Sequence, residues 1–311
     1  SDETVLECIN TSSEVPYTLD EKNVLLLDMC QFSVDDGEFL PEEEILRADN
    51  IARKIAGLKE RNGSVAQPWV IPPEEPEHTI TLKFTVDSDV DIKNPVLALE
   101  DAEKAEITLN GKPVSSDITG WYVDKSIKTV CLHEIVKGRN IITVKLPLGN
   151  RTNTEWCYLL GDFGVKITGR RTLLTALPEK LWFGDIVNQG LAFYGGNITY
   201  HIGDIIAENG ETEVMIPQYR GALVKVLVDG EDKGNIVFSP NTLRIKGLTK
   251  GVHKLDLKLY THRFNSFGAV HNADAALDWH GPDAWRTKEE KWTYEYRLKE
   301  VGILSTPVIK V

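Results

Sequence analysis

Short segments in which apolar and polar residues alternate recur along most of the chain. Residues 78–86, 105–109 and 141–146 each carry an apolar side chain at every second position, and turn residues separate them. A period of two is typical of a strand with one buried and one solvated face. Helices do not alternate regularly with these strands, which argues against a nucleotide-binding α/β sheet. The pattern therefore predicts a mainly β chain built from antiparallel sheets.

The second half of the chain repeats the order of strands found in the first half. Such an internal repeat predicts two related domains in succession. The length of 311 residues also suits two domains better than one. The matched segments are 78–86 with 196–202, 105–111 with 224–230, and 137–146 with 250–259.

The N-terminal part of the chain follows a different pattern. Residues 23–32 are almost continuously apolar, which predicts a buried strand. Pro41 and the three glutamates at 42–44 precede apolar residues at helical spacing over 45–55, which predicts a helix with the glutamates in its first turn. One strand and one helix cannot bury their own apolar faces. We expect this segment to be the tail of a preceding domain or an element packed on the next one.

A proline-rich stretch at 68–76 predicts a stiff, extended connection. We therefore divide the chain into an N-terminal strand–helix segment at 1–64, a first β-sandwich at 65–175 and a second β-sandwich at 176–311. The second sandwich carries a long loop at 261–292 without a clear strand period.

The net charge of −12 argues against a nucleic-acid partner, because a phosphate-binding surface has to be basic. No run of about 18 apolar residues is present, so no membrane span is expected. The chain starts at Ser1 without a leader, which fits an excised region and leaves the compartment open. We expect a soluble protein, for which the bacterial periplasm or exterior is one alternative. The four cysteines lie far apart in apolar runs and are interpreted as buried free thiols.

Two tight turns occupy equivalent places in the repeat. Asn110-Gly111 and Asp229-Gly230 each follow a strand, and both pairs accept the positive φ of a type I′ hairpin. Each turn is followed by a Lys-Gly pair and a strong strand, at 135–144 and 248–257. This order resembles the galactose-binding-like jelly roll, which serves as the sugar-binding domain of glycoside hydrolase family 2 and as an accessory module in other enzymes.

The resemblance covers about 77–170 and 180–311, and its motifs are specific for a fold rather than a ligand. Residues 158–165 and 189–200 also resemble the C-terminal regions of large bacterial glycosidases, including rhamnosidase-like ones. The resemblance implies two tandem antiparallel jelly-roll sandwiches, with an upstream catalytic domain in the same polypeptide as a partner.

The chain shows no signature of a catalytic centre of its own. A glycosidase needs two carboxyl groups at a defined separation, but the acidic runs at 42–44 and 74–77 have the character of solvated surface. The motifs HExxH, GxSxG and GxGxxG and the P-loop do not occur. No cofactor is expected.

Asp87, Asp89 and Asp91 have the alternate spacing of a calcium-binding loop. Ile92 and Ala98 stand where an EF-hand requires glycine and a bidentate glutamate. A polar turn after a strand is therefore the favoured interpretation, and a structural Ca²⁺ ion is the alternative.

The loop at 261–292 holds the best candidates for ligand recognition. Sugars bind aromatic faces through their C–H surfaces, while carboxylates and arginine take their hydroxyl groups. In the alternative, the loop buries its tryptophans as a plug or packs on the catalytic domain. Trp121, Trp156, Trp182 and Tyr194 are interpreted as core or inter-domain residues. The predicted carbohydrate-binding residues are Asp278, Trp279, His280, Asp283, Trp285 and Arg286.

Three functions follow from these features. The first is a non-catalytic accessory region of a glycoside hydrolase that binds glycan or shapes the active site of its parent. The second is a purely structural region that packs on the catalytic domain. The third is a free-standing cell-surface protein that binds glycans.

Overall fold

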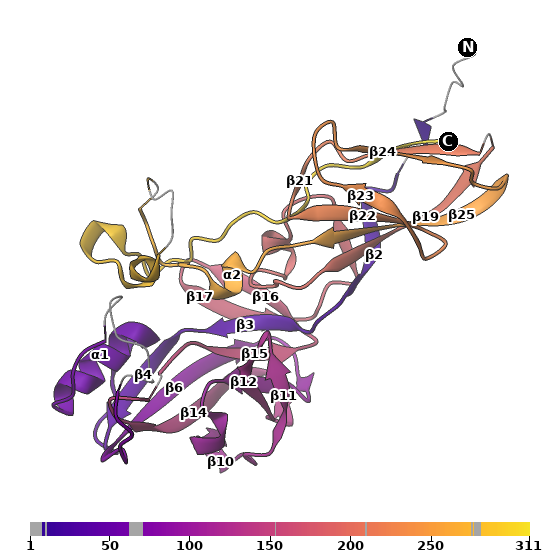
Figure 1. The fold of residues 1–311 in the computed structure, drawn as a ribbon. Helices are drawn as coiled ribbons and strands as arrows, with labels where there is room; N and C mark the ends of the chain where they lie inside the picture. Colours follow the sequence, from indigo (N-terminus) through magenta and orange to yellow (C-terminus); the bar gives the residue numbers. More distant parts are fainter. Residues whose placement is uncertain are drawn as a thin grey trace. The chain divides into compact units, whose positions relative to one another are not determined.

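The computed structural model describes residues 8–9, 11–61, 71–152, 154–208, 210–274, 276 and 281–311. The chain is mainly β, as predicted, with antiparallel sheets in the manner of a β-sandwich (Figure 1). It divides into two compact units, each assembled from separate stretches of sequence. Unit 1 comprises residues 1–22, 177–266 and 298–311, and unit 2 comprises residues 23–176 and 267–297.

Unit 2 contains two large sheets. The five-stranded sheet has the order β11 (Ile118–Tyr122), β12 (Asp124–Cys131), β8 (Val96–Leu99), β15 (Cys157–Gly161) and β3 (Asn23–Leu27). The eight-stranded sheet has the order β10 (Lys112–Pro113), β9 (Glu106–Leu109), β14 (Gly138–Leu148), β6 (His78–Ser88), β17 (Arg171–Thr175) and β16 (Gly164–Thr168), with β4 (Met29–Val34) paired to β6 and β5 (Leu40–Glu44) paired to β4. The other described elements are the pair β7 (Ile92–Lys93) and β13 (Glu134–Ile135), helix α1 (Ile45–Ile55), and the 3-10 turns η2 (Ala102–Lys104), η4 (Pro282–Arg286) and η5 (Glu289–Lys291).

Unit 1 also contains two larger sheets. The six-stranded sheet has the order β18 (Lys180–Trp182), β2 (Glu14–Leu19), β19 (Ile198–Ala207), β25 (Gly251–Tyr260), β22 (Leu223–Val228) and β23 (Glu231–Ile236). The four-stranded sheet has the order β1 (Cys8–Ile9), β27 (Val308–Lys310), β20 (Glu211–Met215) and β24 (Thr242–Lys246). The other described elements are the pair β21 (Tyr219–Arg220) and β26 (Gly302–Ile303), the 3-10 turn η3 (Ile186–Gln189) and the short helix α2 (Phe264–Phe267), in which the chain leaves unit 1.

The repeat predicted from the sequence is present in the order of the strands. In unit 2 the neighbours run β10–β9–β14–β6–β4, and in unit 1 they run β23–β22–β25–β19–β2. The turns that join the hairpins have positive φ angles at both central residues, 50° and 77° at Asn110 and Gly111, and 54° and 80° at Asp229 and Gly230. These values confirm the predicted turn conformation, which asparagine, aspartate and glycine adopt more readily than other residues.

The strands bury alternate residues, as their period of two requires. In unit 2, Phe84 of β6 and Val144 of β14 are fully buried, while the next residue in each strand, Thr85 and Lys145, is more exposed. In unit 1, Tyr200 of β19 shares one hydrophobic core with Val214 of β20 and Ile245 of β24. Because these strands belong to different sheets, the two sheets of unit 1 pack face to face.

The N-terminal segment is not a separate element. Residues 23–61 belong to unit 2, because β3 pairs with β15 and β4 pairs with β6. The single strand predicted at 23–32 is two strands, and the chain passes from one sheet to the other at Asp28. The boundary expected at residue 64 lies outside the described residues. The backbone groups of β3 and β4 are satisfied by strands that lie far ahead in the sequence.

The predicted helix begins later than its glutamates suggested. Leu40–Glu44 forms strand β5, which pairs with β4, and α1 starts at Ile45. Glu44 is the N-cap residue, and its carboxylate accepts hydrogen bonds from the backbone N–H groups of Leu46 and Arg47. Within the described residues, no helix has the length and apolar character needed to cross a membrane.

Candidate functional site

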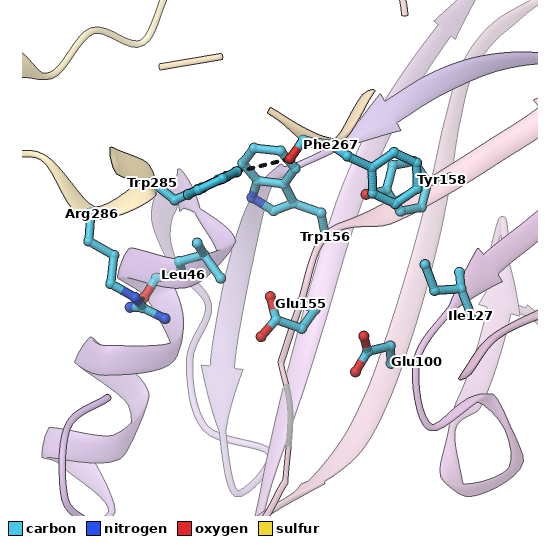
Figure 2. Close-up of a pocket in the computed structure, with 9 residues that line it drawn as sticks. All are labelled: Leu46, Glu100, Ile127, Glu155, Trp156, Tyr158, Phe267, Trp285 and Arg286. Carbon is cyan, nitrogen blue, oxygen red and sulfur yellow. Dashed lines mark hydrogen bonds between the residues drawn. The ribbon is translucent and has the colours of Figure 1, made fainter. Parts of the chain in front are cut away.

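A pocket of about 300 Å³ lies in unit 2 (Figure 2). Aromatic rings form much of its wall, and two carboxylates and one guanidinium are its charged groups. Its lining comes from helix α1, the end of β8, strand β12, the residues around the start of β15, and the segment at 267–297. The lining residues are Leu46, Glu100, Ile127, Glu155, Trp156, Tyr158, Phe267, Trp285 and Arg286.

The aromatic wall is made of rings that support one another. The rings of Tyr158 and Phe267 are stacked with centroids 5.0 Å apart, and Tyr122 packs on both, at 5.2 and 5.8 Å. The indole Nε1 of Trp285 donates a hydrogen bond of 3.2 Å to the carbonyl oxygen of Phe267, as Figure 2 shows. The flat faces of these rings are therefore held in fixed positions, as stacking of a ligand requires.

Helix α1 positions the loop that carries two of the pocket residues, Glu155 and Trp156. The buried Glu44 carboxylate accepts a hydrogen bond of 2.5 Å from the indole Nε1 of Trp156 in addition to capping the helix. Burial raises the pKa of Glu44 to about 7, and the hydrogen bond from Trp156 opposes this shift. The same carboxylate thus joins the start of the helix to the pocket wall.

Arg53, in the last turn of α1, holds the beginning of this loop in place. Its side chain is fully buried, and its Nε lies 2.9 Å from the carboxylate of Asp49. Its two remaining nitrogens donate to the carbonyl oxygens of Gly149 and Thr152, at 2.9 and 2.8 Å. Asp49 and Arg53 lie four residues apart and therefore on the same face of the helix. The face of α1 that carries Asp49 and Arg53 therefore points toward the loop that contains Gly149 and Thr152.

Arg61 extends this network to the pocket itself. Its Nη2 donates to the Glu155 carboxylate at 2.7 Å, and its Nη1 lies 3.8 Å from the Asp49 carboxylate. The pocket residue Arg286 donates to the carbonyl oxygens of Leu46 and Arg61, at 3.4 and 3.5 Å. Burial and the positive charge of Arg61 lower the pKa of Arg286. Arg61 therefore pairs directly with Glu155, and Arg286 lies beside Arg61.

Residues 267–297, here called the returning segment, bring Phe267, Trp285 and Arg286 to the pocket. This segment is anchored by the Asp28 carboxylate, which accepts hydrogen bonds from His271 Nε2 at 2.5 Å and from Tyr296 Oη at 2.7 Å. The other ring nitrogen of His271, Nδ1, donates to the carbonyl oxygen of Thr293 at 2.8 Å. Because a carbonyl and a carboxylate only accept hydrogen bonds, this arrangement fits a positively charged imidazolium.

Further contacts join the returning segment to strand β5 and helix α1. The guanidinium of Arg47 lies 3.8 Å above the ring of Trp292 and donates to the carbonyl oxygen of Thr287 at 2.8 Å. The hydroxyl of Tyr294 donates to the Glu43 carboxylate at 3.0 Å. The pocket therefore depends on contacts between residues more than 200 positions apart in the sequence.

The structure brings together two of the predicted carbohydrate-binding residues, Trp285 and Arg286, at the pocket. Asp278, Trp279, His280 and the side chain of Asp283 lie outside the described residues, so those assignments stay predictions. Trp156 was interpreted as a core or inter-domain residue; it is 8% exposed and forms part of the pocket wall. Trp121 and Trp182, which had the same interpretation, are 56% and 46% exposed.

The other pocket residues were not found from the sequence. Glu100 follows an apolar strand, and Glu155 precedes Trp156 in a loop of ordinary composition. The adjacent acidic and aromatic residues at 155 and 156 were the only available signal, and such pairs also occur on ordinary surfaces.

The three aspartates of the calcium-like loop have other contacts. The Asp87 carboxylate pairs with Arg139 at 3.1 Å, and the Asp91 carboxylate accepts a hydrogen bond of 2.7 Å from the backbone N–H of Lys137. The backbone N–H of Asp89 donates to the carbonyl oxygen of Leu174. Across the described ranges, no group of three or more His, Cys, Asp or Glu side chains is arranged to hold a metal ion.

No protein-family model and no curated protein matches the chain. Among solved structures, it is similar to a rhamnosidase from Novosphingobium sp. PP1Y (16% identity, 77% of this chain, 23% of that chain, TM-score 0.31). It is also similar to a GH2 beta-galacturonidase from Eisenbergiella tayi (9% identity, 78% of this chain, 37% of that chain, TM-score 0.28). A further similar structure is an anti-sigma factor domain-containing protein from Clostridium clariflavum (8% identity, 76% of this chain, 90% of that chain, TM-score 0.21). The chain spans less than two fifths of the length of these two glycoside hydrolases, and likenesses with TM-scores this low carry no argument about its activity.

Proposed function

We propose that this chain is a non-catalytic, glycan-binding accessory region of a glycoside hydrolase and that the pocket of unit 2 receives one sugar residue of the glycan. The observation that carries the proposal is the composition of this pocket. Trp156, Phe267 and Trp285 line a cavity together with Glu100, Glu155 and Arg286. A sugar ring has an apolar C–H face, which packs on aromatic rings, and a rim of hydroxyl groups, which bind to polar or charged side chains.

The size of the pocket agrees with this ligand. Its volume of about 300 Å³ lies at the lower end of the usual range for small-molecule sites, about 300–1,000 Å³. Such a pocket suits one sugar residue better than a longer oligosaccharide. The carboxylates accept hydrogen bonds from hydroxyl groups, and the guanidinium of Arg286 donates to hydroxyl oxygens.

The accessory role rests on the sequence resemblance to the sugar-binding sandwiches of glycosidases. The hairpin turns that carry this resemblance have the expected conformation in both units. A catalytic domain in the same polypeptide is part of the proposal, and the pocket would then hold the glycan near the active site of that domain.

A titration of the full chain with saccharides tests the binding role. We expect neutral mono- and oligosaccharides, such as galactose, glucose, mannose and rhamnose oligomers, to change the tryptophan fluorescence in a saturable manner. Trp285→Ala removes one stacking face of the pocket, and we expect it to weaken binding at least tenfold, which is about 1.4 kcal/mol.

Trp121→Ala is the matched control, because Trp121 belongs to unit 2 but does not line the pocket. It should leave the dissociation constants unchanged. If no saccharide from a broad plant and host panel binds the wild-type chain, the binding role is wrong and the structural alternative is favoured. A gene without a catalytic domain would instead favour the free-standing glycan-binding protein.

A further inference from the structure

We propose that the ion pair between Arg61 and Glu155 makes the pocket selective for uncharged sugars over uronic acids and amino sugars. This inference rests on the proposed glycan-binding function and specifies the class of sugar that the same site takes. Arg61 is then a specificity-determining residue, although it does not itself line the pocket.

The geometry of the pair fixes one carboxylate oxygen and leaves the group in the pocket wall. Arg61 Nη2 donates to Oε1 of Glu155 at 2.7 Å, and the two side chains are 17% and 32% exposed. Asp49, which is fully buried, lies 3.8 Å from Arg61 Nη1 and is itself paired with the buried Arg53. Arg61 is therefore held between the carboxylates of Glu155 and Asp49.

The ion pair balances the charges of the described residues at the pocket. Among the described lining residues, Glu100 and Glu155 are negative and Arg286 is positive. Arg61 supplies the second positive charge directly behind Glu155. Among the described residues at the pocket, two carboxylates and two guanidinium groups therefore leave no net charge for an ionic ligand to neutralise.

Each class of charged sugar meets a repulsive group in this arrangement. A uronic acid brings a third carboxylate toward Glu100 and Glu155, and an amino sugar brings an ammonium toward Arg286 and Arg61. Like charges in a partly desolvated site oppose binding. An uncharged sugar of the same shape meets only hydrogen-bond donors and acceptors.

The test compares three ligands of one shape on the full chain, namely galactose, galacturonate and galactosamine, with the glucose series measured in parallel. Dissociation constants are determined by calorimetry at a pH at which the amine is protonated. For the wild-type chain, we expect the neutral sugar of either series to bind roughly tenfold more tightly than both charged analogues.

Three variants then change the charge in a defined direction. Arg61→Met leaves the site with one excess negative charge, so the affinity for galactosamine relative to galactose should rise roughly tenfold. Glu155→Gln leaves one excess positive charge, so the relative affinity for galacturonate should rise by a similar factor. The double variant Arg61→Met/Glu155→Gln is neutral again and should return both ratios close to the wild-type values.

Arg139→Met is the matched control, because Arg139 forms an exposed ion pair with Asp87 in the same unit. It should change neither ratio. If Arg61 has only a structural role, Arg61→Met should lower the affinity for all three ligands by the same factor. This outcome would overturn the inference while leaving the proposed function intact. Equal affinities of the wild-type chain for neutral and charged sugars would also overturn it, without use of any variant. Failure of every sugar to bind would overturn both proposals.

Discussion

The Asp28 carboxylate lies 2.5 Å from Nε2 of His271, and both side chains are buried, although 243 positions separate them in the sequence. Asp28 stands where the chain passes from strand β3 to strand β4, and His271 belongs to the returning segment. Burial alone would lower the pKa of His271, but the hydrogen bond and the negative charge of Asp28 outweigh this effect, and the pKa is raised. This pair anchors the segment that completes the pocket.

Removal of the imidazolium should destabilise unit 2 strongly. We expect His271→Gln to lower the free energy of unfolding by about 3–5 kcal/mol, because Asp28 would stay buried without its charged partner. Denaturant unfolding measures this loss. His78→Gln removes an exposed histidine–aspartate pair in the same unit and should cost less than about 1 kcal/mol. Equal effects of the two substitutions would show that the Asp28–His271 pair is not an anchor.

The stability of unit 2 should fall as the pH rises through neutrality. The raised pKa of His271 gives stability that is fully present below its ordinary pKa of 6.5 and is lost as the pH rises through the folded value. The pKa of Glu44, raised from 4.5 to about 7 by burial, acts in the same direction, because the charged form is disfavoured in the folded state. The contribution of Glu44 to the stability of unit 2 therefore decreases as the pH rises from about 4.5 to 7.

Exposed carboxylates with lowered pKa values, such as Asp35 beside His78, act in the opposite direction at acid pH. We therefore expect the highest melting temperature between about pH 4 and 5. Glu44→Gln cannot ionise and should reduce the fall in melting temperature between about pH 5 and 8. An unchanged pH profile in this variant would contradict the assignment to Glu44.

Arg53 is the second buried charge on which the pocket depends. Arg53→Met should cost about 3–5 kcal/mol of unfolding free energy, because it removes the nearer cationic partner of the buried Asp49 and the donors to Gly149 and Thr152. Arg139→Met breaks an exposed ion pair and should cost less than about 1 kcal/mol. A loss for Arg53→Met no larger than for Arg139→Met would show that the helix does not hold the loop.

Gly111 provides a test of the hairpin that the two units share. Its φ angle is 77°, and a Cβ atom at this position would meet no atom within 4 Å. Gly111→Ala should therefore cost about 1–2 kcal/mol from backbone strain alone. Gly111→Asn should cost less, because asparagine adopts this conformation more readily. Thermal unfolding of the two variants measures the difference, and equal losses would contradict the argument.

Calcium should not stabilise the loop at 87–91. Asp87 is paired with Arg139, and Asp91 accepts the backbone N–H of Lys137, so a bound ion would have to replace both contacts. We expect the melting temperature to stay the same after treatment with EDTA and after addition of Ca²⁺. A rise on adding Ca²⁺ that is absent in Asp89→Ala would instead restore the calcium interpretation.

The sequence by itself determined the strands, the hairpins and the internal repeat. These features are local, because a period of two and an Asn-Gly or Asp-Gly turn depend on neighbouring residues. It also drew attention to Trp285 and Arg286 through the composition of one loop. It did not show that the helix begins at Ile45, because Leu40–Glu44 becomes a strand only by pairing with β4.

Only the tertiary structure decided how the pocket is assembled. Trp156 is held by Glu44 at the start of helix α1 and Glu155 by Arg61, each about 100 positions earlier in the chain, and the returning segment is held by Asp28. A buried charge needs a partner, but the sequence does not reveal which of 47 acidic and 35 basic residues will supply it. Those pairings depend on how the sheets and the helix pack, and therefore on contacts that no local pattern encodes.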